Sequence, residues 1–367
     1  MTRASPDRPK PAAVLPMSDI ERRKNEHLDI VLSGAGRARV SSRLDEVVFE
    51  HCALPEMDIA EVDLSVEVFG KRLAAPLLIS SMTGGPRRAG AINAHLAEAA
   101  QRLGVAFAVG SQRVALEAGV GIGLGADLRS IAPEALLLAN FGAAQLNEGW
   151  GVEEARRVVD MIAADALIVH LNVLQEAVQP GGDRNWAGLL DRLAEVVRGV
   201  SVPVVVKEVG NGISGRVARR LVEIGVAGVD VSGAGGTSWA AVESERAQGR
   251  AARMAAAFAG WGIPTAVAIA DVRAACPHAL VIGSGGVRDG LDVARALRLG
   301  ADLAGQAAGV LEAAVQSADA VVEHFEAVMA ELRIACFCTG SRTLAELRRA
   351  PLAQEPCWVR HEVLGAL

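Results

Sequence analysis

The feature that most constrains the fold is an alternation of short apolar runs with helical patterns after residue 75. Buried strands that alternate with helices indicate a parallel sheet. The eight apolar runs are Pro76–Ser80, Phe107–Gly110, Ala135–Phe141, Ala166–His170, Val202–Lys207, Gly228–Ser232, Ala279–Gly283 and Asp302–Gln306. The helical patterns are Ala89–Leu103, Val152–Ala164, Trp186–Arg198, Gly215–Ile224, Glu243–Phe258 and Gly290–Leu299.

Eight such units in succession favour a closed (β/α)8 TIM barrel over an open, doubly wound sheet. The open sheet stays an alternative, although the dinucleotide-binding fingerprint expected after its first strand is absent. Apolar stretches at Leu44–Val48, Ile59–Leu64 and Glu67–Phe69 predict short strands that close the bottom of the barrel. The segment 310–349 predicts two helices. We therefore expect a barrel with an N-terminal extension and C-terminal helices.

The chain divides into four parts. Residues 1–18 are rich in proline and lack the apolar core of a signal peptide, so we expect a disordered tail. Residues 19–75 form the N-terminal extension, and residues 76–349 form the barrel. Residues 350–367 are a C-terminal tail. We expect one folded domain.

Composition excludes several classes of function. A net charge of −6 argues against a general nucleic-acid binder. No apolar run reaches the roughly 18 residues of a membrane span. Five cysteines, an odd count, indicate reduced thiols rather than a disulfide framework. Cys336 and Cys338 lack a second pair to complete a zinc site, so we expect buried thiols. These features predict a cytoplasmic protein without a membrane or nucleic-acid partner.

Polar side chains follow the fourth apolar run. His170, Asn172, Gln175 and Glu176 come between that run and the glycine-rich loop Gln179–Asp183. In a parallel α/β protein the carboxyl ends of the strands carry the chemistry. The segment therefore suggests acid–base or metal-dependent chemistry. Taken alone, His170 is more often a hydrogen-bonded histidine at the barrel mouth.

Glycine-rich loops follow several of the predicted strands. They include Met82–Gly85, Gly233–Gly236, Gly283–Gly286 and Ala307–Gly309. Glycines let backbone N–H groups approach an anion, and the loops after strands seven and eight are the usual phosphate site of the barrel. A phosphorylated cofactor is therefore the favoured hypothesis.

Lys207 and Asn140, at the ends of two predicted strands, can hydrogen-bond the N1–C2 side of a flavin ring. Two alternatives stay open for Lys207. It can form a Schiff base with pyridoxal phosphate, or it can form a salt bridge inside the barrel mouth.

The ordered set of motifs resembles type 2 isopentenyl-diphosphate isomerases, an FMN-dependent enzyme family of isoprenoid synthesis. The resemblance runs from about Glu21 to Leu347. The matching motifs are Arg23-Lys24-x-Glu26-His27, Ser81-Met82-Thr83-Gly84-Gly85, Gly110-Ser111-Gln112-Arg113, His170-Leu171-Asn172 through Gln175-Glu176, Lys207-Glu208-Val209-Gly210, Gly235-Gly236-Thr237-Ser238-Trp239 and Ser284-Gly285-Gly286. Gln306 and Ala308-Gly309 depart from the pattern of many relatives.

The resemblance implies interconversion of isopentenyl and dimethylallyl diphosphate by a 1,3-proton shift. Reduced FMN serves as acid and base, Mg²⁺ binds the diphosphate, and NADPH reduces the flavin. It also implies a homo-oligomer, either a tetramer or an octamer. The implied catalytic residues are Gln175, His170 and Asn172. The implied substrate-binding residues are Arg23, Lys24, Ser111, Arg113 and Gln175, and the metal ligand is Glu176. The implied FMN contacts are Met82, Thr83, Gly84, Ser111, Asn140, Lys207, Ser232, Thr237, Gly286, Val287, Arg288, Ala307 and Ala308.

The sequence disfavours two other classes of protein. A flavin oxidoreductase of the 2-hydroxy-acid oxidase type relies on a His-Gly-x-Arg motif and on tyrosine, and this chain has neither. A non-catalytic phosphate-binding barrel has no need for the His170–Glu176 segment beside a basic pair.

Several residues also have a purely structural interpretation. Without the family, Arg23 and Lys24 are simply a solvated charge patch. Trp239 either packs over a loop or walls a prenyl chain. We expect His27 to be a structural hydrogen-bonding residue, and Glu208 and Asp230 to anchor loops by accepting backbone N–H groups.

Overall fold

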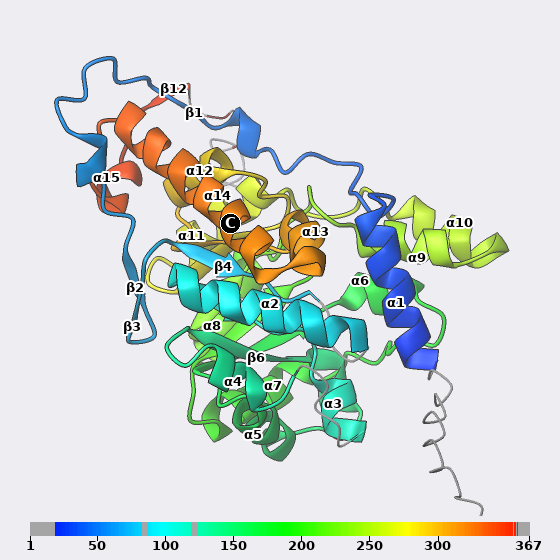
Figure 1. Cartoon of the computed structure of the whole chain (residues 1–367). Helices are drawn as coiled ribbons and strands as arrows, with labels where there is room; N and C mark the ends of the chain where they lie inside the picture. Colours follow the sequence, from blue (N-terminus) through cyan, green and yellow to red (C-terminus); the bar gives the residue numbers. More distant parts are fainter. Residues whose placement is uncertain (1–18, 83–86, 119–123, 355, 357, 359–367) are drawn as a thin grey trace, which may run out of the picture.

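The computed structural model describes residues 19–82, 87–118, 124–354, 356 and 358 (Figure 1). Eight parallel strands close into one barrel in the order β10-β11-β4-β5-β6-β7-β8-β9, which confirms the barrel over the open sheet. The expected disorder of residues 1–18 lies outside the described residues. The barrel strands are β4 Leu77–Ile79, β5 Ala106–Ala108, β6 Leu137–Gly142, β7 Ala166–Leu171, β8 Val204–Glu208, β9 Gly228–Asp230, β10 Leu280–Ser284 and β11 Leu303–Gln306.

Helices surround the barrel (Figure 1). One expected helix, Glu243–Phe258, is wrong: the chain forms two helices, because Ala247 and Gln248 between them are extended. In the C-terminal segment two long helices meet at Ser317, which caps the second, and a one-turn helix follows. The helices are α1 Asp19–Leu32, α2 Arg87–Leu103, α3 Arg113–Ala118, α4 Asp127–Ile131, α5 Val152–Met161, α6 Val173–Val178, α7 Leu189–Gly199, α8 Gly215–Glu223, α9 Trp239–Arg246, α10 Gly249–Ala257, α11 Thr265–Ala275, α12 Gly290–Arg298, α13 Ala308–Gln316, α14 Ala318–Cys338 and α15 Leu344–Leu347. None of these described helices is long and apolar enough to span a bilayer.

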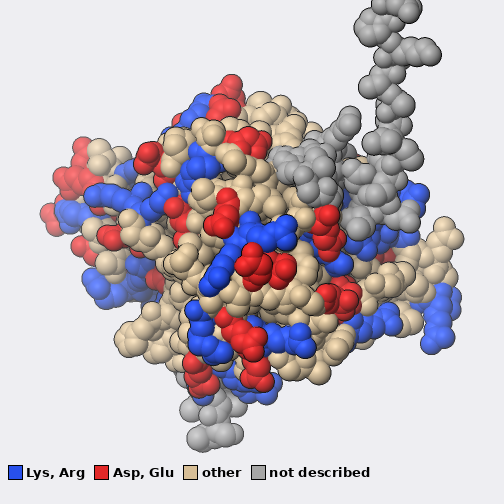
Figure 2. All heavy atoms as spheres, turned by 90° about the horizontal axis from the view of Figure 1, so that it is seen from below, with Lys and Arg blue, Asp and Glu red and all other residues tan. Residues whose placement is uncertain are grey.

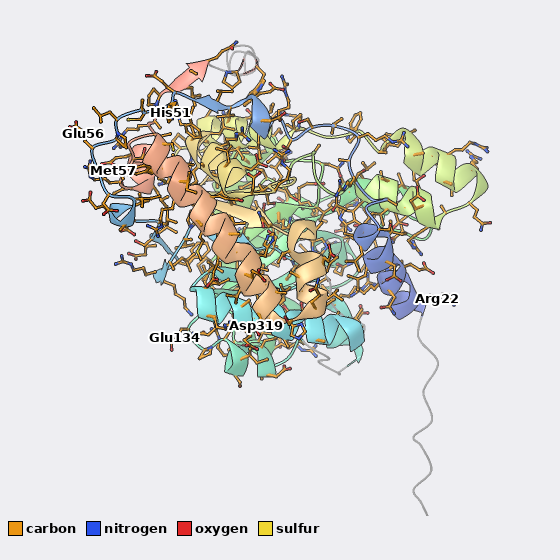
Figure 3. All side chains as sticks on the ribbon, turned by 45° about the horizontal axis from the view of Figure 1, so that its top comes forward. Arg22, His51, Glu56, Met57, Glu134 and Asp319 are labelled. Carbon is orange, nitrogen blue, oxygen red and sulfur yellow. The ribbon has the colours of Figure 1, made fainter. Side chains whose placement is uncertain are left out.

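The N-terminal extension corrects two expected strands. The stretches at 44–48 and 59–64 begin as the 3-10 helices η1 (Leu44–Glu46) and η2 (Ile59–Glu61), because polar side chains compete for their backbone groups; the Asp58 carboxylate, for example, accepts the N–H of Ala60. The first stretch becomes extended only at its end, where β1 (Val48–Phe49) pairs with β12 (Leu352–Gln354) of the tail. The extension runs from Arg22 on α1 to His51, Glu56 and Met57 at the far side of the molecule (Figure 3).

The hairpin of β2 (Val66–Val68) and β3 (Lys71–Leu73) closes the bottom of the barrel, as expected for the third stretch. Its side chains Val68 and Leu73 join the apolar cluster that fills the barrel interior. The rest of that interior layer consists of Leu78, Ala106, Ala108, Leu136, Leu138, Ala166, Ile168, Val205, Ile282 and Leu303. The barrel is therefore packed below and offers no path through its centre.

Side-chain alternation places polar residues above this apolar layer. Leu138, Ile168, Val205 and Ile282 point inward, so the residues two positions later on each strand point inward as well. Those positions are occupied by Asn140, His170, Lys207 and Ser284. The sequence therefore changes from apolar to polar at the carboxyl end of the barrel.

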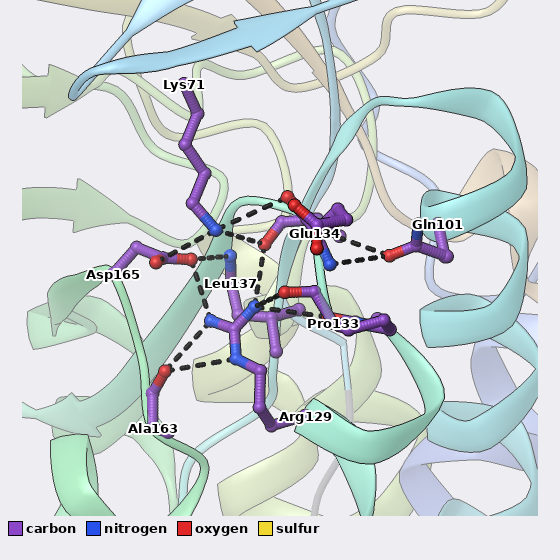
Figure 4. A network of polar contacts seen from close by, with 10 residues as sticks. Lys71, Gln101, Arg129, Pro133, Glu134, Leu137, Ala163 and Asp165 are labelled. Carbon is purple, nitrogen blue, oxygen red and sulfur yellow. Dashed lines mark hydrogen bonds and ion pairs between the residues drawn. The ribbon is translucent and has the colours of Figure 1, made fainter.

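The bottom of the barrel is held by an arginine network between strands (Figure 4). Arg129 Nη1 donates to the carbonyls of Ala132, Pro133 and Ala135 at 3.0–3.2 Å, and Nη2 donates to Asp165 Oδ2 at 2.8 Å. Asp165 also accepts the N–H of Leu137 at 2.9 Å. This arginine thus joins the starts of β6 and β7.

The same arrangement recurs four strands later. Arg273 donates to the carbonyls of Pro277 and Ala279 and to Asp302 Oδ2 at 2.5 Å, and Asp302 accepts the N–H of Val281. The two networks share residue types at identical spacing. The matched pairs are Asp127 with Asp271, Arg129 with Arg273, Pro133 with Pro277, Ala135 with Ala279, Leu136 with Leu280 and Gly142 with Gly286. The third and seventh strands are therefore internal repeats.

The surface carries charges of both signs, and the buried thiol expected at Cys336 is confirmed, whereas Cys338 is half-buried. On the face seen in Figure 2, basic and acidic side chains alternate at short range. The described cysteines form no disulfide: Cys276 and Cys336 are buried, and Cys52 and Cys338 are half-buried.

Candidate active site

A ring of polar side chains lies above the apolar interior of the barrel, at the carboxyl ends of the strands. It consists of Ser80, Asn140, His170, Lys207, Asp230 and Ser284, one from each of six strands or strand ends. All are buried except His170, which is partly exposed. Two buried oxygens of this ring, Ser80 Oγ and Asp230 Oδ2, have no hydrogen-bond partner among the described residues. Because unpaired buried polar atoms are costly, the ring fits a polar ligand.

His170 belongs to a chain of hydrogen bonds across two strands. Its Nδ1 lies 2.8 Å from Asn140 Oδ1, and Asn140 Nδ2 donates to Ser81 Oγ at 2.8 Å. Burial, with the positive charges of Lys207 and Lys24, lowers the pKa of His170 to about 4. His170 is therefore neutral at pH 7 and donates a hydrogen bond to Asn140, which agrees with the hydrogen-bonded histidine that the residue alone suggested.

Glu176 stands on the first turn of α6, directly after the strand that carries His170. Its Oε1 accepts a hydrogen bond from Asn172 Nδ2 at 2.7 Å, and its Oε2 accepts the N–H of Asp183 at 2.8 Å. Gln175 is adjacent, with Oε1 3.4 Å from Asn172 Nδ2. A Cβ at Gly182 would collide with the carbonyl oxygen of Glu176, so this loop needs glycine there. Hydrogen bonds therefore hold Asn172, Gln175 and Glu176 together and join them to the loop at Asp183.

A metal at Glu176 would need ligands from outside the protein. The described residues contain no group of three or more His, Cys, Asp or Glu side chains that could hold an ion. Mg²⁺ is commonly bound by one or two carboxylates together with phosphate oxygens and water. Glu176 therefore fits a magnesium ion that binds together with a phosphorylated substrate.

Cationic side chains converge on this side of the mouth. Burial and the positive charges of Arg23 and Arg113 lower the pKa of Lys24 to about 8, and Lys24 in turn acts on His170. Arg113 bonds Glu117 Oε1 at 3.0 Å and lies 3.4 Å from Asp183 Oδ2. Cations from α1 and α3 are therefore held close together despite their repulsion. This arrangement suits an anion of high charge.

The helix α1 is held in place by a buried contact with α9. His27 Nε2 lies 2.9 Å from Oε1 of the fully buried Glu243, and Arg246 Nη1 binds Oε2 of the same carboxylate at 2.7 Å. The His27 ring meets Trp239 edge to face at 5.1 Å. The structural role expected for His27 is confirmed, and Trp239 packs over α1. Arg23 and Lys24 are thus presented by an anchored helix.

Lys207 continues the ring on β8, beside His170, and Glu208 follows it. Lys207 Nζ donates to the carbonyl of Glu208 at 2.7 Å and lies 3.5 Å from Asp230 Oδ2, so the ion pair considered for this lysine is present. Glu208 accepts the N–H groups of the next three residues, which confirms its role as a loop anchor. Burial raises the pKa of Glu208 to about 7, while those N–H groups oppose the rise.

The loops after β9 and β10 pack backbone against backbone. A Cβ on Gly286, which has φ 73°, would lie 2.5 Å from the carbonyl oxygen of Gly235. The N-cap of α13 is Ala307, which has no polar side chain to satisfy the first N–H groups of the helix. A glycine cradle therefore adjoins a helix N-terminus, as a phosphate site requires. Arg288 pairs with the buried Asp292 through Nε at 2.7 Å and Nη2 at 3.1 Å.

The remaining residues expected to contact FMN lie at strand ends and in the loops above the barrel, or outside the described residues. Ser232 follows β9, Thr237 pairs with Arg37 in an isolated bridge, and Val287 is buried. Met82 and Ser111 are half-buried at strand ends. Thr83 and Gly84 lie outside the described residues.

The sequence assigned no role to Asp183, which connects α3, the 3-10 helix after β6 and α6. Its side chain accepts from Gln145 Nε2 at 3.3 Å and contacts Arg113, while its N–H binds Glu176. The roles of Ser80 and Ser284 in the ring were also missed. The available signal was the inward position of both serines, two residues after an inward apolar residue.

Comparison with known proteins places this geometry in a class. The model of the FMN-dependent dehydrogenase family matches residues 143–354. A mandelate oxidase mutant with an FMN adduct has the same fold, with a TM-score of 0.64 and 19% identity over 92% of this chain and all of that one. Mandelate oxidase with (S)-2-phenylpropionate has a TM-score of 0.62 and 20% identity over 91% of this chain and 97% of its own. The fold and the match define a barrel of the FMN-dependent dehydrogenase class.

Relatives in sequence identify one family within this class. Isopentenyl-diphosphate delta-isomerase of Xanthobacter autotrophicus is 60% identical over 90% of this chain and 97% of its own. The enzyme of that name from Stutzerimonas stutzeri is 62% identical over 90% of this chain and 96% of its own. The one from a Synechocystis species is 50% identical over 92% of this chain and 97% of its own. The chain belongs to the isopentenyl-diphosphate delta-isomerase family.

Proposed function

We propose that the chain interconverts isopentenyl and dimethylallyl diphosphate in isoprenoid biosynthesis. The observation that carries the proposal is the convergence of Arg23, Lys24 and Arg113 on the segment His170–Glu176, above a buried ring that contains Lys207. A diphosphate fits the cations, and a flavin fits the ring. The family relatives support the same reaction.

The reaction adds a proton at C4 of the alkene and removes one from C2. Neither carbon is acidic or basic, so the acid and base must be preorganised in a dry site. Reduced FMN, when bound, supplies an acid–base nitrogen at N5 without net redox change. The residues of the chain bind, orient and shield the substrate.

On the substrate side, Arg23, Lys24, Ser111 and Arg113 bind the diphosphate. Glu176 holds Mg²⁺ against it, because a hard cation prefers carboxylate and phosphate oxygens. Paired donors make arginine well suited to phosphate.

The reacting carbons lie nearer the ring. Gln175 is a poor acid, so it orients the substrate or relays a proton. Asn172 fixes Glu176 and Gln175, and neutral His170 fixes Asn140.

On the flavin side, the unpaired hydroxyl of Ser80 and the glycine cradle at Gly286 fit FMN. Lys207 and Asn140 hydrogen-bond the ring. The proposed FMN contacts are Met82, Thr83, Gly84, Ser111, Asn140, Lys207, Ser232 and Thr237, with Gly286, Val287, Arg288, Ala307 and Ala308 around the phosphate. Residues 76–349 form the FMN-binding barrel, and residues 19–75 supply the Arg23–Lys24 pair.

We further propose NADPH as the reductant of the flavin, a tetramer or octamer as the assembly and the cytoplasm as the location. The resemblance to the family supports these proposals, together with the reduced thiols for the location. The alternative, a 2-hydroxy-acid oxidase, is disfavoured because the chain lacks both tyrosine and the His-Gly-x-Arg motif.

The test is a comparison of the two activities in one preparation. Purified protein that carries FMN is yellow. Reduced anaerobically with NADPH or dithionite and supplied with Mg²⁺, it should interconvert the two diphosphates without making peroxide. The proposal fails if only the oxidised enzyme consumes substrate and releases peroxide, or if mandelate is oxidised while isopentenyl diphosphate is unchanged.

A further inference from the structure

Asp230 is a fully buried carboxylate that the proposed reaction does not use. It ends β9 and has no exposed surface. Its Oδ1 accepts the hydroxyl of Ser284 at 2.6 Å and the N–H of Ser232 at 3.3 Å. Its Oδ2 lies 3.5 Å from Lys207 Nζ and has no hydrogen-bond partner among the described residues. One side chain therefore contacts groups from β8, β10 and the loop after β9.

These contacts fix the conformation of the groups proposed to meet the flavin. Lys207 and Asp230 are paired in register on neighbouring strands. Ser232 has φ 36°, which residues other than glycine rarely adopt, and its N–H is held by Asp230. The carboxylate thus stabilises a strained turn and limits where the ammonium group can lie.

The electrostatic effect follows from the geometry. An ammonium group has three N–H donors; one binds the Glu208 carbonyl and one faces Asp230, so one remains for a ligand. A buried lysine without a carboxylate would place a full positive charge beside that ligand. The negative charge of Asp230 offsets part of the positive charge of Lys207. The effect is large because charges in the protein interior interact more strongly than in water.

We propose that Asp230 is a positioning residue of the flavin site, which directs Lys207 toward the ring and lowers the reduction potential of bound FMN. The inference rests on the proposed flavin site. A reduced flavin carries negative charge near N1, so a positive neighbour favours reduction and a compensating carboxylate opposes it.

The experiment measures the two-electron reduction potential of FMN in the purified holoenzyme, by absorbance against a reference dye. Asp230→Asn should raise the reduction equilibrium constant about tenfold or more, equivalent to about 30 mV for a two-electron couple. Asp319→Asn is the matched control. It removes a carboxylate at the surface beside Arg102, away from the barrel mouth, and should leave the potential unchanged (Figure 3).

Two further variants keep the test decisive if Asp230→Asn fails to fold or to retain FMN. Lys207→Met should lower the potential. The double variant Lys207→Met with Asp230→Asn removes both charges together and should return the potential toward that of the wild type. The inference is overturned if Asp230→Asn binds FMN at the wild-type potential, or if the double variant shifts as far as Lys207→Met alone.

The outcomes also separate this inference from the proposed function. A wild-type protein that binds FMN but does not isomerise refutes the isomerase while the potentials still test Asp230. An active isomerase in which Asp230→Asn leaves the potential unmoved refutes only the role of Asp230.

Discussion

Raising the pH from 7 to 9 should weaken substrate binding by discharging Lys24. Burial and the neighbouring Arg23 and Arg113 lower the pKa of this lysine to about 8. A diphosphate favours the protonated form. The contribution of Lys24 to affinity is therefore complete well below pH 8 and is lost as the pH rises through that value.

The size of the effect follows from proton linkage. If bound diphosphate keeps Lys24 protonated throughout this range, the apparent dissociation constant scales with one plus the ratio of neutral to charged lysine in the free enzyme. With a pKa of about 8, that factor is about 1.1 at pH 7, about 2 at pH 8 and about 11 at pH 9. Affinity should fall about tenfold across the two pH units.

The assay is the KM of the reduced holoenzyme for isopentenyl diphosphate at saturating Mg²⁺, between pH 7 and 9. Lys24→Arg is the matched variant, because a guanidinium stays protonated throughout this range and should remove the rise in KM. Lys24→Met should give a high KM that varies little with pH. The reasoning is refuted if the wild-type KM is constant, or if Lys24→Arg keeps the same rise.

Three other substitutions test separate parts of the structure. Glu176→Gln should raise the Mg²⁺ concentration for half-maximal activity at least tenfold with FMN content unchanged; loss of flavin would place Glu176 on the wrong side of the site. Gly182→Ala should shift the Mg²⁺ requirement in the same direction, because its Cβ meets the Glu176 carbonyl, and an unchanged requirement would contradict this. Arg273→Ala should lower the free energy of unfolding in urea by at least about 2 kcal/mol. Arg102→Ala, at an exposed ion pair, should leave it nearly unchanged; equal losses would refute the role of the network.

The sequence predicted the barrel well because its strands are buried on both faces. Such strands are continuous apolar runs, and each of the eight runs contains or overlaps a barrel strand. Short apolar stretches of the extension were less informative. The helix Thr265–Ala275 gave no amphipathic pattern, since it is buried on most sides between α8 and β10.

The sequence located the candidate site through strand ends, but not the contacts between loops. His170, Lys207 and Glu176 stand out because each follows an apolar run or a motif. The role of Asp183 depends on Arg113, on α3, and on Gln145, in the 3-10 helix after β6, and no local pattern encodes contacts between these segments. Asp230 accepts the N–H of Ser232, as expected of a loop anchor, but its contacts with Lys207 and Ser284 on the neighbouring strands have no signal in the local sequence. Carboxylates that organise a site across loops become visible only in three dimensions.

The internal repeat explains why the two ends of this barrel are so different. At the bottom, Arg129 and Arg273 make equivalent hydrogen bonds, because both must satisfy carbonyl groups where a helix ends and a strand begins. At the top, Gly142 and Gly286 occupy equivalent positions but serve different neighbours. A side chain at Gly142 would strike the Gln145 amide and the His170 ring, whereas one at Gly286 would strike the backbone of the loop after β9. The two segments therefore share the residues that hold the strands at the bottom, while their upper ends differ. One adjoins the proposed substrate side and the other the proposed FMN phosphate, as expected where stability and chemistry occupy opposite faces.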